Sequence, residues 1–172
     1  MITVIKATLH GVRALSRKLL KLLEDKEGQV YQENVTKFGI PEEHVRKAFA
    51  EETLLEAATT GNSTFYLALE NRCKILGFAQ AIQRNAETAE LDRIVVFPEH
   101  TRKGIGTQLL KRVLEDQERK GTKTVVVNAG KEETHARKFY EKNGFEVVRQ
   151  AIVEAPWGKI TLATYQLRLR SV

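Results

Sequence analysis

The sequence predicts a mixed α/β domain, and three observations lead to this fold class. Apolar residues follow strand-like spacing in some segments and helical spacing in others. A strand, an amphipathic helix and the β-branched run Val125-Val126-Val127 follow one another, and this order implies a parallel strand pair. The 172 residues contain no Gly/Ser-rich linker, so we expect residues 1–172 to form a single domain.

The apolar patterns predict about seven strands and four helices. The strands are expected at residues 2–7, 64–69, 75–83, 89–97, 125–127, 146–153 and 160–169. The helices are expected at residues 12–23, 41–58, 104–120 and 134–143, with an irregular segment over residues 25–39. Val12, Leu15 and Leu19 lie on one face of the first helix. Pro41 suits the start of the second helix, and Gly121 suits the end of the third.

Composition and charge restrict the possible functions. Lys and Arg number 28 against 22 Asp and Glu, and the net charge of +6 favours a phosphate-bearing cofactor or nucleic acid. The single Cys73 excludes an internal disulfide, and the four histidines lack metal-ligand spacing, so no metal is expected. No run approaches the roughly 20 apolar residues of a membrane span, and no signal peptide is visible. We therefore expect a soluble, cytoplasmic protein without a membrane partner.

A basic turn with two glycines is the first motif that carries chemistry. A buried strand runs through Pro98 into the turn Arg-Lys-Gly-Ile-Gly-Thr at residues 102–107, and a helix follows. The glycines permit a sharp turn and remove side chains that would obstruct a ligand, while the helix start offers free N–H groups. The turn therefore predicts a phosphate or pyrophosphate site. It matches neither a Walker loop nor a dinucleotide fingerprint, because Leu109 stands where the latter needs a small residue.

A second motif, Ala-Arg-Lys-Phe-Tyr-Glu-Lys-Asn-Gly-Phe, covers residues 136–145. Alone, it describes an amphipathic helix with a glycine stop. The two motifs, in this order and with a valine strand between them, resemble the GNAT superfamily of acetyl-CoA-dependent N-acyltransferases. The first motif matches over residues 94–110 and the second without a gap, so the resemblance covers residues 75–150. The irregular segment and second helix, followed by a β-hairpin, are similar to those of the branch that contains bacterial spermidine/spermine acetyltransferases.

The resemblance implies a GNAT-like fold with a splayed central parallel strand pair, and acetyl-CoA as cosubstrate. Its pyrophosphate would be held by the backbone N–H groups of Arg102, Lys103, Gly104, Ile105, Gly106 and Thr107. Ile94 and Val96 would pair with the pantetheine arm, and Tyr140 would face the sulfur. The sequence departs from the family pattern at Thr101, where Arg or Gln is usual. It departs again at Glu133, where an asparagine commonly helps to hold the cofactor, so Glu133 is given no such role.

The reaction implied by the resemblance is N-acetylation of a primary amine by direct attack within a ternary complex. An alkyl ammonium has a pKa near ~10.4 and must first lose a proton, which a carboxylate can accept directly or through water. The base of protein-lysine acetyltransferases falls on Glu90 by its spacing from Thr101, and Asp92 is expected on the same strand face. The N–H of Val96 would stabilise the oxyanion, and Tyr140 would protonate the leaving thiolate.

Two other function classes stay open at this point. A non-catalytic acyl-CoA-binding or sensing module on the same fold would keep the glycine turn without needing Tyr140. A nucleic-acid-binding domain would need a basic stripe with stacking aromatics, but aromatics are only 7%, so no nucleic acid is expected.

The acceptor, a small-molecule, polyamine or protein amine, is expected to contact residues 25–60 and 154–159, where Trp157 could line its site. A homodimer would be consistent with the family.

Overall fold

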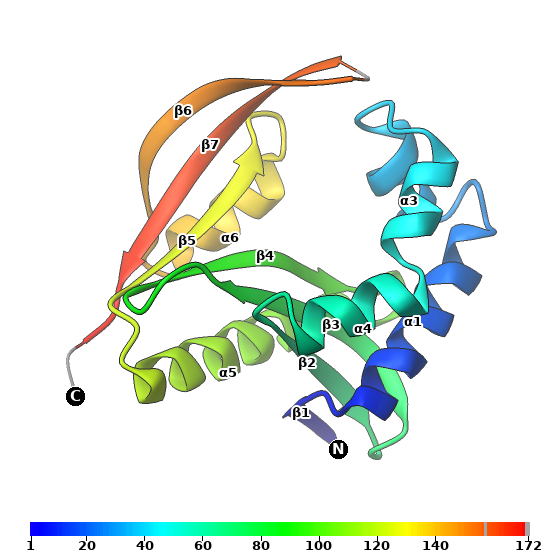
Figure 1. Ribbon diagram of the computed structural model, residues 1–172, viewed down its shortest axis with the longest axis horizontal. Coiled ribbons are helices and arrows are strands. Elements are labelled where there is room, and N and C mark those ends of the chain that lie inside the picture. Colours follow the sequence, from blue (N-terminus) through cyan, green and yellow to red (C-terminus); the bar gives the residue numbers. More distant parts are fainter. Residues whose placement is uncertain (157, 171–172) are drawn as a thin grey trace.

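A seven-stranded sheet forms the centre of the computed structural model, which describes residues 1–156 and 158–170. Trp157 therefore lies outside the described residues. The strands are β1 (Ile2–Lys6), β2 (Ser63–Glu70), β3 (Lys74–Gln83), β4 (Thr88–Val96), β5 (Thr124–Gly130), β6 (Glu146–Ala155) and β7 (Gly158–Arg168). Their spatial order is β1-β2-β3-β4-β5-β7-β6 (Figure 1). Among these strands only β4 and β5 are parallel neighbours, as the strand–helix–strand pattern predicts.

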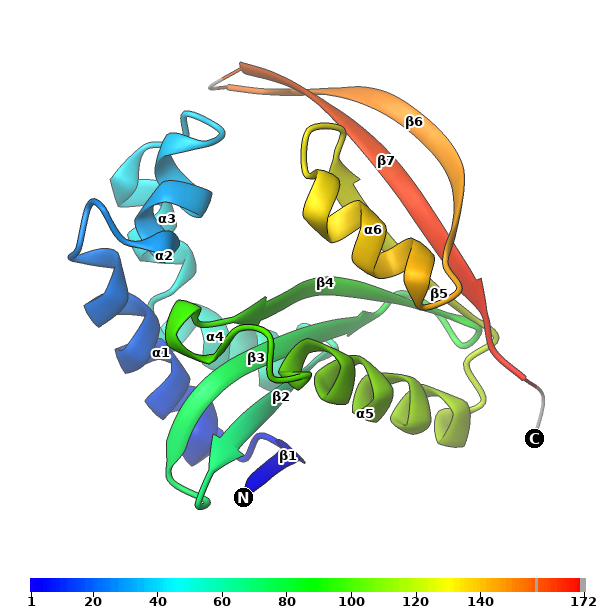
Figure 2. The ribbon, with the colours of Figure 1, turned by 180° about the vertical axis from the view of Figure 1, so that it is seen from behind.

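Helices cover both faces of the first part of the sheet (Figures 1 and 2). In chain order they are α1 (Leu9–Leu23), α2 (Gln29–Tyr31), the π-helical η1 (Gln32–Thr36), α3 (Glu42–Ala48), α4 (Glu51–Thr59), the 3₁₀-helical η2 (Pro98–His100), α5 (Ile105–Lys120) and α6 (Thr134–Lys142). Helices α1 to α4 lie on one side, and α5 and α6 lie on the other. No helix in the described part of the chain is long and apolar enough to span a membrane.

Two hydrophobic cores lie on the two faces of the sheet. The core under α5 and α6 includes Leu91, Leu109 and Tyr165, and the core under α1 and α4 includes Leu15 and Phe78. All five side chains are almost inaccessible to solvent. Because successive strand residues point to opposite faces, β2 and β3 supply side chains to both cores, which explains their nearly continuous burial.

The parallel strands β4 and β5 are paired over only a short stretch and then separate. Their pairing runs from Thr88 opposite Thr124 to Glu90 opposite Val126. Beyond these positions β4 remains paired with β3, while β5 is paired with β7 (Figure 1). We call the region beyond Glu90 and Val126, where the facing edges of β4 and β5 are unpaired, the strand split. It is the feature that the family resemblance implies.

The prediction of one helix over residues 41–58 is wrong, because α3 and α4 are separate helices. Ala50 is extended, with ψ 146°, and begins α4. Its neighbour Phe49 is 2% exposed, and the Phe49 carbonyl accepts a hydrogen bond of 2.7 Å from the Ser16 hydroxyl of α1. Burial of this ring and the use of its carbonyl hold the chain in a bend. Residues 25–39 also contain more order than expected, since α2 and η1 lie within them.

Candidate active site

The glycine turn joins the end of β4 to the N-terminus of α5, where the sequence places it. Arg102 and Gly104 have φ of 64° and 75°, in the left-handed region. Within the described chain, no group accepts a hydrogen bond from the backbone N–H groups of residues 102–107, and the first helical bond is donated by Gln108 to Gly104. The turn therefore presents consecutive unpaired donors at the positive end of the helix dipole, beside the exposed side chains of Arg102 and Lys103. This arrangement suits a phosphate group.

The two glycines of the turn do different things. Gly104 caps α5 with a positive φ, which a residue with a side chain adopts only under strain. Gly106 is not among the residues with positive φ. A Cβ atom on Gly106 would lie 3.6 Å from Cε1 of Phe139 and 3.7 Å from Cγ2 of Val96. Gly104 thus makes the turn, whereas Gly106 preserves space where β4, α5 and α6 meet.

Strand β4 offers a free main-chain edge at the two residues predicted to contact pantetheine. The N–H of Phe97 donates a hydrogen bond of 3.0 Å to the carbonyl of Leu76 beside β4. Because the N–H and C=O groups of successive strand residues point to opposite edges, those of Ile94 and Val96 point away from β3 and toward the strand split. Their side chains pack against the core under α5.

Tyr140 lies on α6 and is 6% exposed. Its ring centroid lies 5.6, 5.7 and 6.0 Å from those of Phe139, Phe145 and Tyr165, respectively. The Tyr140 hydroxyl has no hydrogen-bond partner among the residues described. Burial raises the pKa of Tyr140 above its ordinary value, and the nearby Glu133 carboxylate raises it further. The hydroxyl therefore keeps its proton throughout the physiological pH range.

Glu133 ties the turn before α6 to the helical region near the N-terminus. The Nζ of Lys37 lies 3.3 Å from Oε1 of Glu133, and Oε2 accepts a hydrogen bond of 3.0 Å from the N–H of Gly130. A Cβ atom on Gly130 would lie 3.7 Å from the ring of Phe38, so this ring packs on the same turn. We call these contacts of Lys37 and Phe38 with Glu133 and Gly130 the 37–133 latch. Both oxygens of Glu133 are engaged within the protein.

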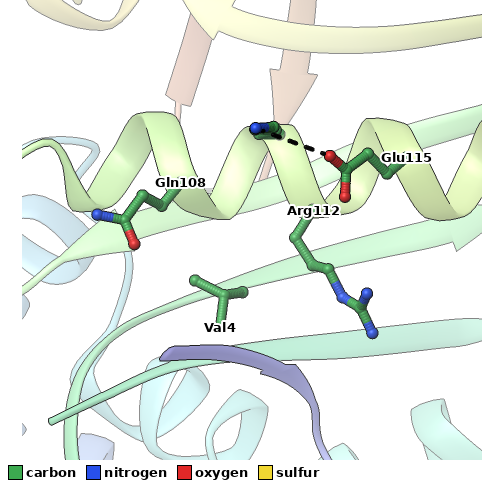
Figure 3. Close-up of a pocket in the computed structure, with 5 residues that line it drawn as sticks. Val4, Gln108, Arg112 and Glu115 are labelled. Atoms are coloured by element: carbon green, nitrogen blue, oxygen red, sulfur yellow. Dashed lines mark ion pairs between the residues drawn. The ribbon is translucent and has the colours of Figure 1, made fainter. Parts of the chain in front are cut away.

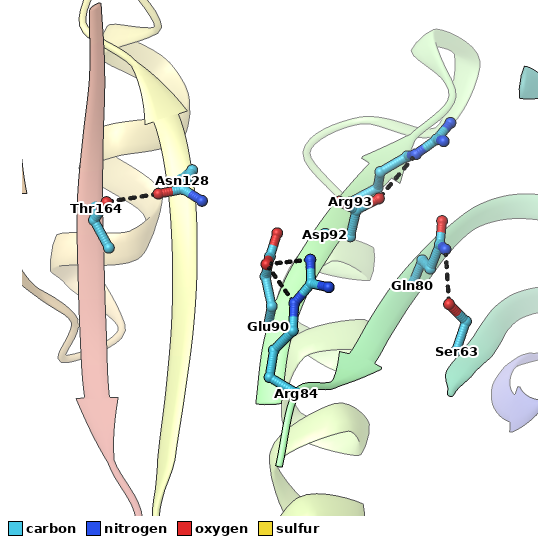
Figure 4. A network of polar contacts seen from close by, with 8 residues as sticks. All are labelled: Ser63, Gln80, Arg84, Glu90, Asp92, Arg93, Asn128 and Thr164. Atoms are coloured by element: carbon cyan, nitrogen blue, oxygen red, sulfur yellow. Dashed lines mark hydrogen bonds and ion pairs between the residues drawn. The ribbon is translucent and has the colours of Figure 1, made fainter. Parts of the chain in front are cut away.

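Glu90, the predicted base, lies at the closed end of the strand split, opposite Val126. Its Oε1 accepts hydrogen bonds of 2.9 and 2.7 Å from Nε and Nη2 of Arg84 (Figure 4). The Glu90 side chain is 17% exposed. The guanidinium of Arg84 therefore places a positive charge directly against the Glu90 carboxylate. Sequence reasoning missed Arg84, although its position just after the strand that pairs with β4 was a usable signal.

A β-bulge lies on β4 next to Glu90. Glu90 pairs with Ile82, and Arg93 pairs with Gln80. The step between these pairs is two residues on β3 but three on β4, and Asp92 is the extra residue. Directly paired residues share a face of the sheet, and the bulge therefore puts Arg93 on the face of Glu90. The Nε of Arg93 lies 3.4 Å from Oδ2 of Asp92.

Further polar groups line the same region and were not predicted (Figure 4). Gln80 is 5% exposed, and its Nε2 donates a hydrogen bond of 3.1 Å to the hydroxyl of Ser63. The Oε1 of Gln80 is buried and has no partner. On the other side of the strand split, the hydroxyl of Thr164 donates a hydrogen bond of 2.6 Å to Oδ1 of Asn128. These pairs become visible only once the strand register is known.

Two surface hollows adjoin α5. One, of about 260 Å³, lies between β1 and α5, where Val4 faces Gln108 and Arg112, while Lys111 and Glu115 form an ion pair of 4.0 Å on the same helix (Figure 3). The other, of about 430 Å³, is lined by Thr107, Leu110, Lys111, Leu114, Glu115, Glu118 and Asn143. The second hollow adjoins Thr107 of the glycine turn and continues along α5.

Solved structures share this fold at low sequence identity. The PaiA N-acetyltransferase of Thermoplasma acidophilum, in complex with coenzyme A, is 20% identical with a TM-score of 0.69, over 94% of this chain and 98% of that one. The ribosomal-protein-S18-alanine N-acetyltransferase of Escherichia coli is 17% identical with a TM-score of 0.70, over 100% and 96%. A GNAT acetyltransferase of Elizabethkingia anophelis with acetyl-CoA bound is 20% identical with a TM-score of 0.64, over 98% of each chain.

Comparison with curated proteins found no match. A family model, in contrast, matches the chain directly. The model of the acetyltransferase (GNAT) domain covers residues 61–147, which is half of the chain and contains β2 to β5, the glycine turn and α6. The match therefore includes both sides of the strand split and the two motifs from which the sequence predicted an acetyl-CoA site. This chain belongs to the GNAT family of acetyltransferases.

Proposed function

We propose that this acetyltransferase moves the acetyl group of acetyl-CoA onto a primary amine by direct attack within a ternary complex. The observation that carries the proposal is the row of unpaired N–H groups at residues 102–107, which opens beside the free edge of β4. A pyrophosphate carries the negative charge and acceptor oxygens that such a row binds. Gly106 supports the fit, because its missing side chain leaves room between β4 and the helices.

Main-chain groups of β4 would hold the pantetheine arm. The N–H and C=O groups of Ile94 and Val96 point into the strand split, where they lack a strand partner. An amide-containing arm can form hydrogen bonds with such an edge as an added strand would. The N–H of Val96 could then donate to the thioester oxygen as negative charge develops there.

Glu90 would take the proton that the acceptor amine must lose. Arg84 contacts only its Oε1, and its Oε2 accepts no hydrogen bond within the described chain. The amine has an ordinary pKa near ~10.4, so a carboxylate is a weak base for it, and transfer through a water to solvent is the natural route. The nitrogen forms a bond to the acetyl carbon, the carbon–sulfur bond breaks, and the electron pair leaves with sulfur.

Tyr140 would stabilise the departing sulfur. Its hydroxyl has no acceptor in the described chain, and its raised pKa keeps the proton in place. A thiol has a pKa near ~8.5, below that of this phenol, so Tyr140 is better suited to donate a hydrogen bond to the thiolate than to give up its proton outright. This refines the expectation that Tyr140 acts as a general acid.

An acetylation assay with acetyl-CoA and a panel of primary amines, read by mass spectrometry, tests the proposal. We expect an acetylated amine from the wild type, and a kcat lower by about 10² in Tyr140→Phe with unchanged affinity for coenzyme A. Gly106→Val should instead weaken the binding of coenzyme A. Tight binding of coenzyme A without turnover of any amine would overturn the proposal and favour a sensing module.

A further inference from the structure

Three carboxylates beside the strand split have cationic partners. Glu90 is paired with Arg84 at 2.7 Å, Glu133 with Lys37 at 3.3 Å, and Asp92 with its neighbour Arg93 at 3.4 Å. An acceptor amine with several positive charges would find no spare carboxylate among these three. Arg93, in contrast, keeps unused hydrogen-bond donors, because its contact with Asp92 engages only Nε.

The guanidinium of Arg93 is held in place but not satisfied. Its Cζ lies 5.3 Å from the ring centroid of Phe49, at the bend between α3 and α4. Neither terminal nitrogen donates a hydrogen bond within residues 1–156 and 158–170. The Arg93 side chain is 29% exposed, so it is partly withdrawn from water yet reachable by a ligand. A planar, fixed fork of two donors is the group that proteins use to bind carboxylate or phosphate.

A second polar group beside Arg93 also lacks a partner. Gln80 is directly opposite Arg93 in the ladder and is 5% exposed. Its Nε2 is bound to Ser63, while its Oε1 has no donor. A buried acceptor without a donor destabilises the fold unless a ligand or water donates to it. Arg93 and Gln80 therefore hold two donor nitrogens and one buried acceptor oxygen that have no partner in the described chain.

We propose that Arg93 is a specificity residue that binds an anionic group, a carboxylate or a phosphate, on the amine acceptor. This inference rests on the proposed function. It names the class of acceptor as an amine that carries a negative charge close to its nitrogen, and it disfavours polyamines. The residue acts on the acceptor alone, because Ile94 and Val96, which would bind pantetheine, direct their side chains to the opposite face of the sheet.

The spacing along the sheet supports this class. Glu90 and Arg93 occupy ladder positions opposite Ile82 and Gln80, which are two residues apart on β3. Two residues of a strand span roughly 7 Å, so Glu90 and Arg93 lie about one strand repeat apart on the same face. An acceptor whose amine lies near Glu90 can reach Arg93 with an anion only one to a few bonds away. Small amino acids and aminoalkyl phosphates have this size.

Matched pairs of acceptors test the inference. The pairs are an amino acid with its amide, phosphoethanolamine with ethanolamine, and spermidine as the polycation. We expect the wild type to favour the anionic member of at least one pair by about tenfold or more in kcat/KM. The carboxylate pair and the phosphate pair distinguish the two sources of charge. Preference for spermidine or for the neutral members would overturn the inference while leaving the proposed function intact.

Variants separate this role from a structural one. Arg93→Gln should lower kcat/KM for the preferred anionic acceptor about 10- to 100-fold, through KM, and leave its neutral partner and the KM of acetyl-CoA unchanged. Arg93→Lys keeps the charge and should recover part of the loss. Arg149→Gln, on exposed β6, removes the same charge elsewhere and should change nothing. Equal losses for anionic and neutral acceptors in Arg93→Gln would contradict the inference, and no acetylation of any amine by wild type would overturn both proposals.

Discussion

The two sides of the strand split are built differently. On the β1–β4 side, helices cover both faces of the sheet and two cores meet in β2 and β3, where Leu76 is fully buried. On the β5–β7 side, α6 covers one face, and the edge strand β6 leaves Val148 and Ile152 55% and 68% exposed. The side that is packed on both faces carries the glycine turn and Glu90, whereas the side that is packed on one face carries Tyr140.

Three kinds of contact join these two sides. They are the core under α5 and α6, the short parallel pairing that ends at Glu90 and Val126, and the 37–133 latch at the open end. If the β1–β4 side contributes most of the free energy of unfolding, the same kind of substitution should lower that free energy far more on this side than on the other. Removing the latch should lower it little.

The largest contrast should come from the same kind of truncation on each side. Leu76→Ala in β3 should lower the free energy of unfolding by about 2–5 kcal/mol, because it empties part of a fully buried core. Ile152→Ala in β6 should change it by less than about 0.5 kcal/mol, because this side chain is mostly in water. Urea unfolding of both variants measures the two values. Similar costs would refute the comparison.

A buried polar cluster on the β1–β4 side should give the next largest effect. Asp116 of α5 accepts a hydrogen bond from Tyr66, and its Oδ1 lies 2.8 Å from Lys6 of β1. Asp116→Asn should destabilise the protein by about 3 kcal/mol at neutral pH, because Lys6 and Tyr66 lose a charged acceptor. Thermal or urea unfolding gives the loss. A cost below about 1 kcal/mol would show that the cluster does not hold β1 and α5 together.

The pH dependence of this cluster has a definite sign. Burial alone would raise the pKa of Asp116, but the hydrogen bonds from Lys6 and Tyr66 outweigh it and lower the pKa below its ordinary value of 3.8. A carboxylate with a lowered folded-state pKa stabilises the fold above its unfolded-state pKa, and this stabilisation is lost as pH falls through the lower value. The stability difference between wild type and Asp116→Asn should therefore be constant above about pH 5 and shrink below pH 4. A difference that grows on acidification would contradict this assignment.

The two glycines of the turn beside the split should differ from each other. Gly104→Ala should cost about 1 kcal/mol, because φ 75° strains a residue with a Cβ atom. Gly106→Ala should be neutral to stability within about 0.5 kcal/mol, because its Cβ would meet its neighbours at ordinary contact distance. Thermal unfolding compares them. Equal costs would mean that both glycines serve the turn alone.

The smallest effect is expected for the latch. Lys37→Met should destabilise the protein by no more than about 0.5 kcal/mol, because the side chains of Lys37 and Glu133 are 38% and 25% exposed and the ion pair is screened by water. A double-mutant cycle with Glu133→Gln, repeated at high salt, isolates the pairwise part of the interaction. A coupling above about 2 kcal/mol would show that the two sides depend on the latch for stability.

The sequence predicted the sheet well, because strand and helix periodicity are local properties of the chain. The α/β class, the parallel pair and the helix that starts at the glycine turn are all confirmed. The break at Phe49 was not predictable, because it depends on burial of that ring and on a bond from Ser16, which is distant in sequence. Local propensity alone favoured a continuous helix there.

The site, too, has features that nearby residues predict and features that depend on residues distant in sequence. Motifs located the glycine turn and Tyr140, since backbone conformation and helix periodicity are written in nearby residues. The partners of Glu90 and Glu133 were missed, because Arg84 and Lys37 are brought to them by strand register and by a packed segment. The orientation of Arg93 depends on a one-residue bulge, which periodicity does not reveal.

Backbone amide exchange at residues 102–107, followed by NMR with and without coenzyme A, tests whether the glycine turn binds the pyrophosphate. In the free protein these amides should exchange quickly, because no group in the described chain accepts their hydrogen bonds. Bound coenzyme A should slow them by about tenfold or more, while Gln108, already bonded to Gly104, should change little. Binding of coenzyme A that leaves the exchange at residues 102–107 unchanged would show that the turn does not hold the pyrophosphate.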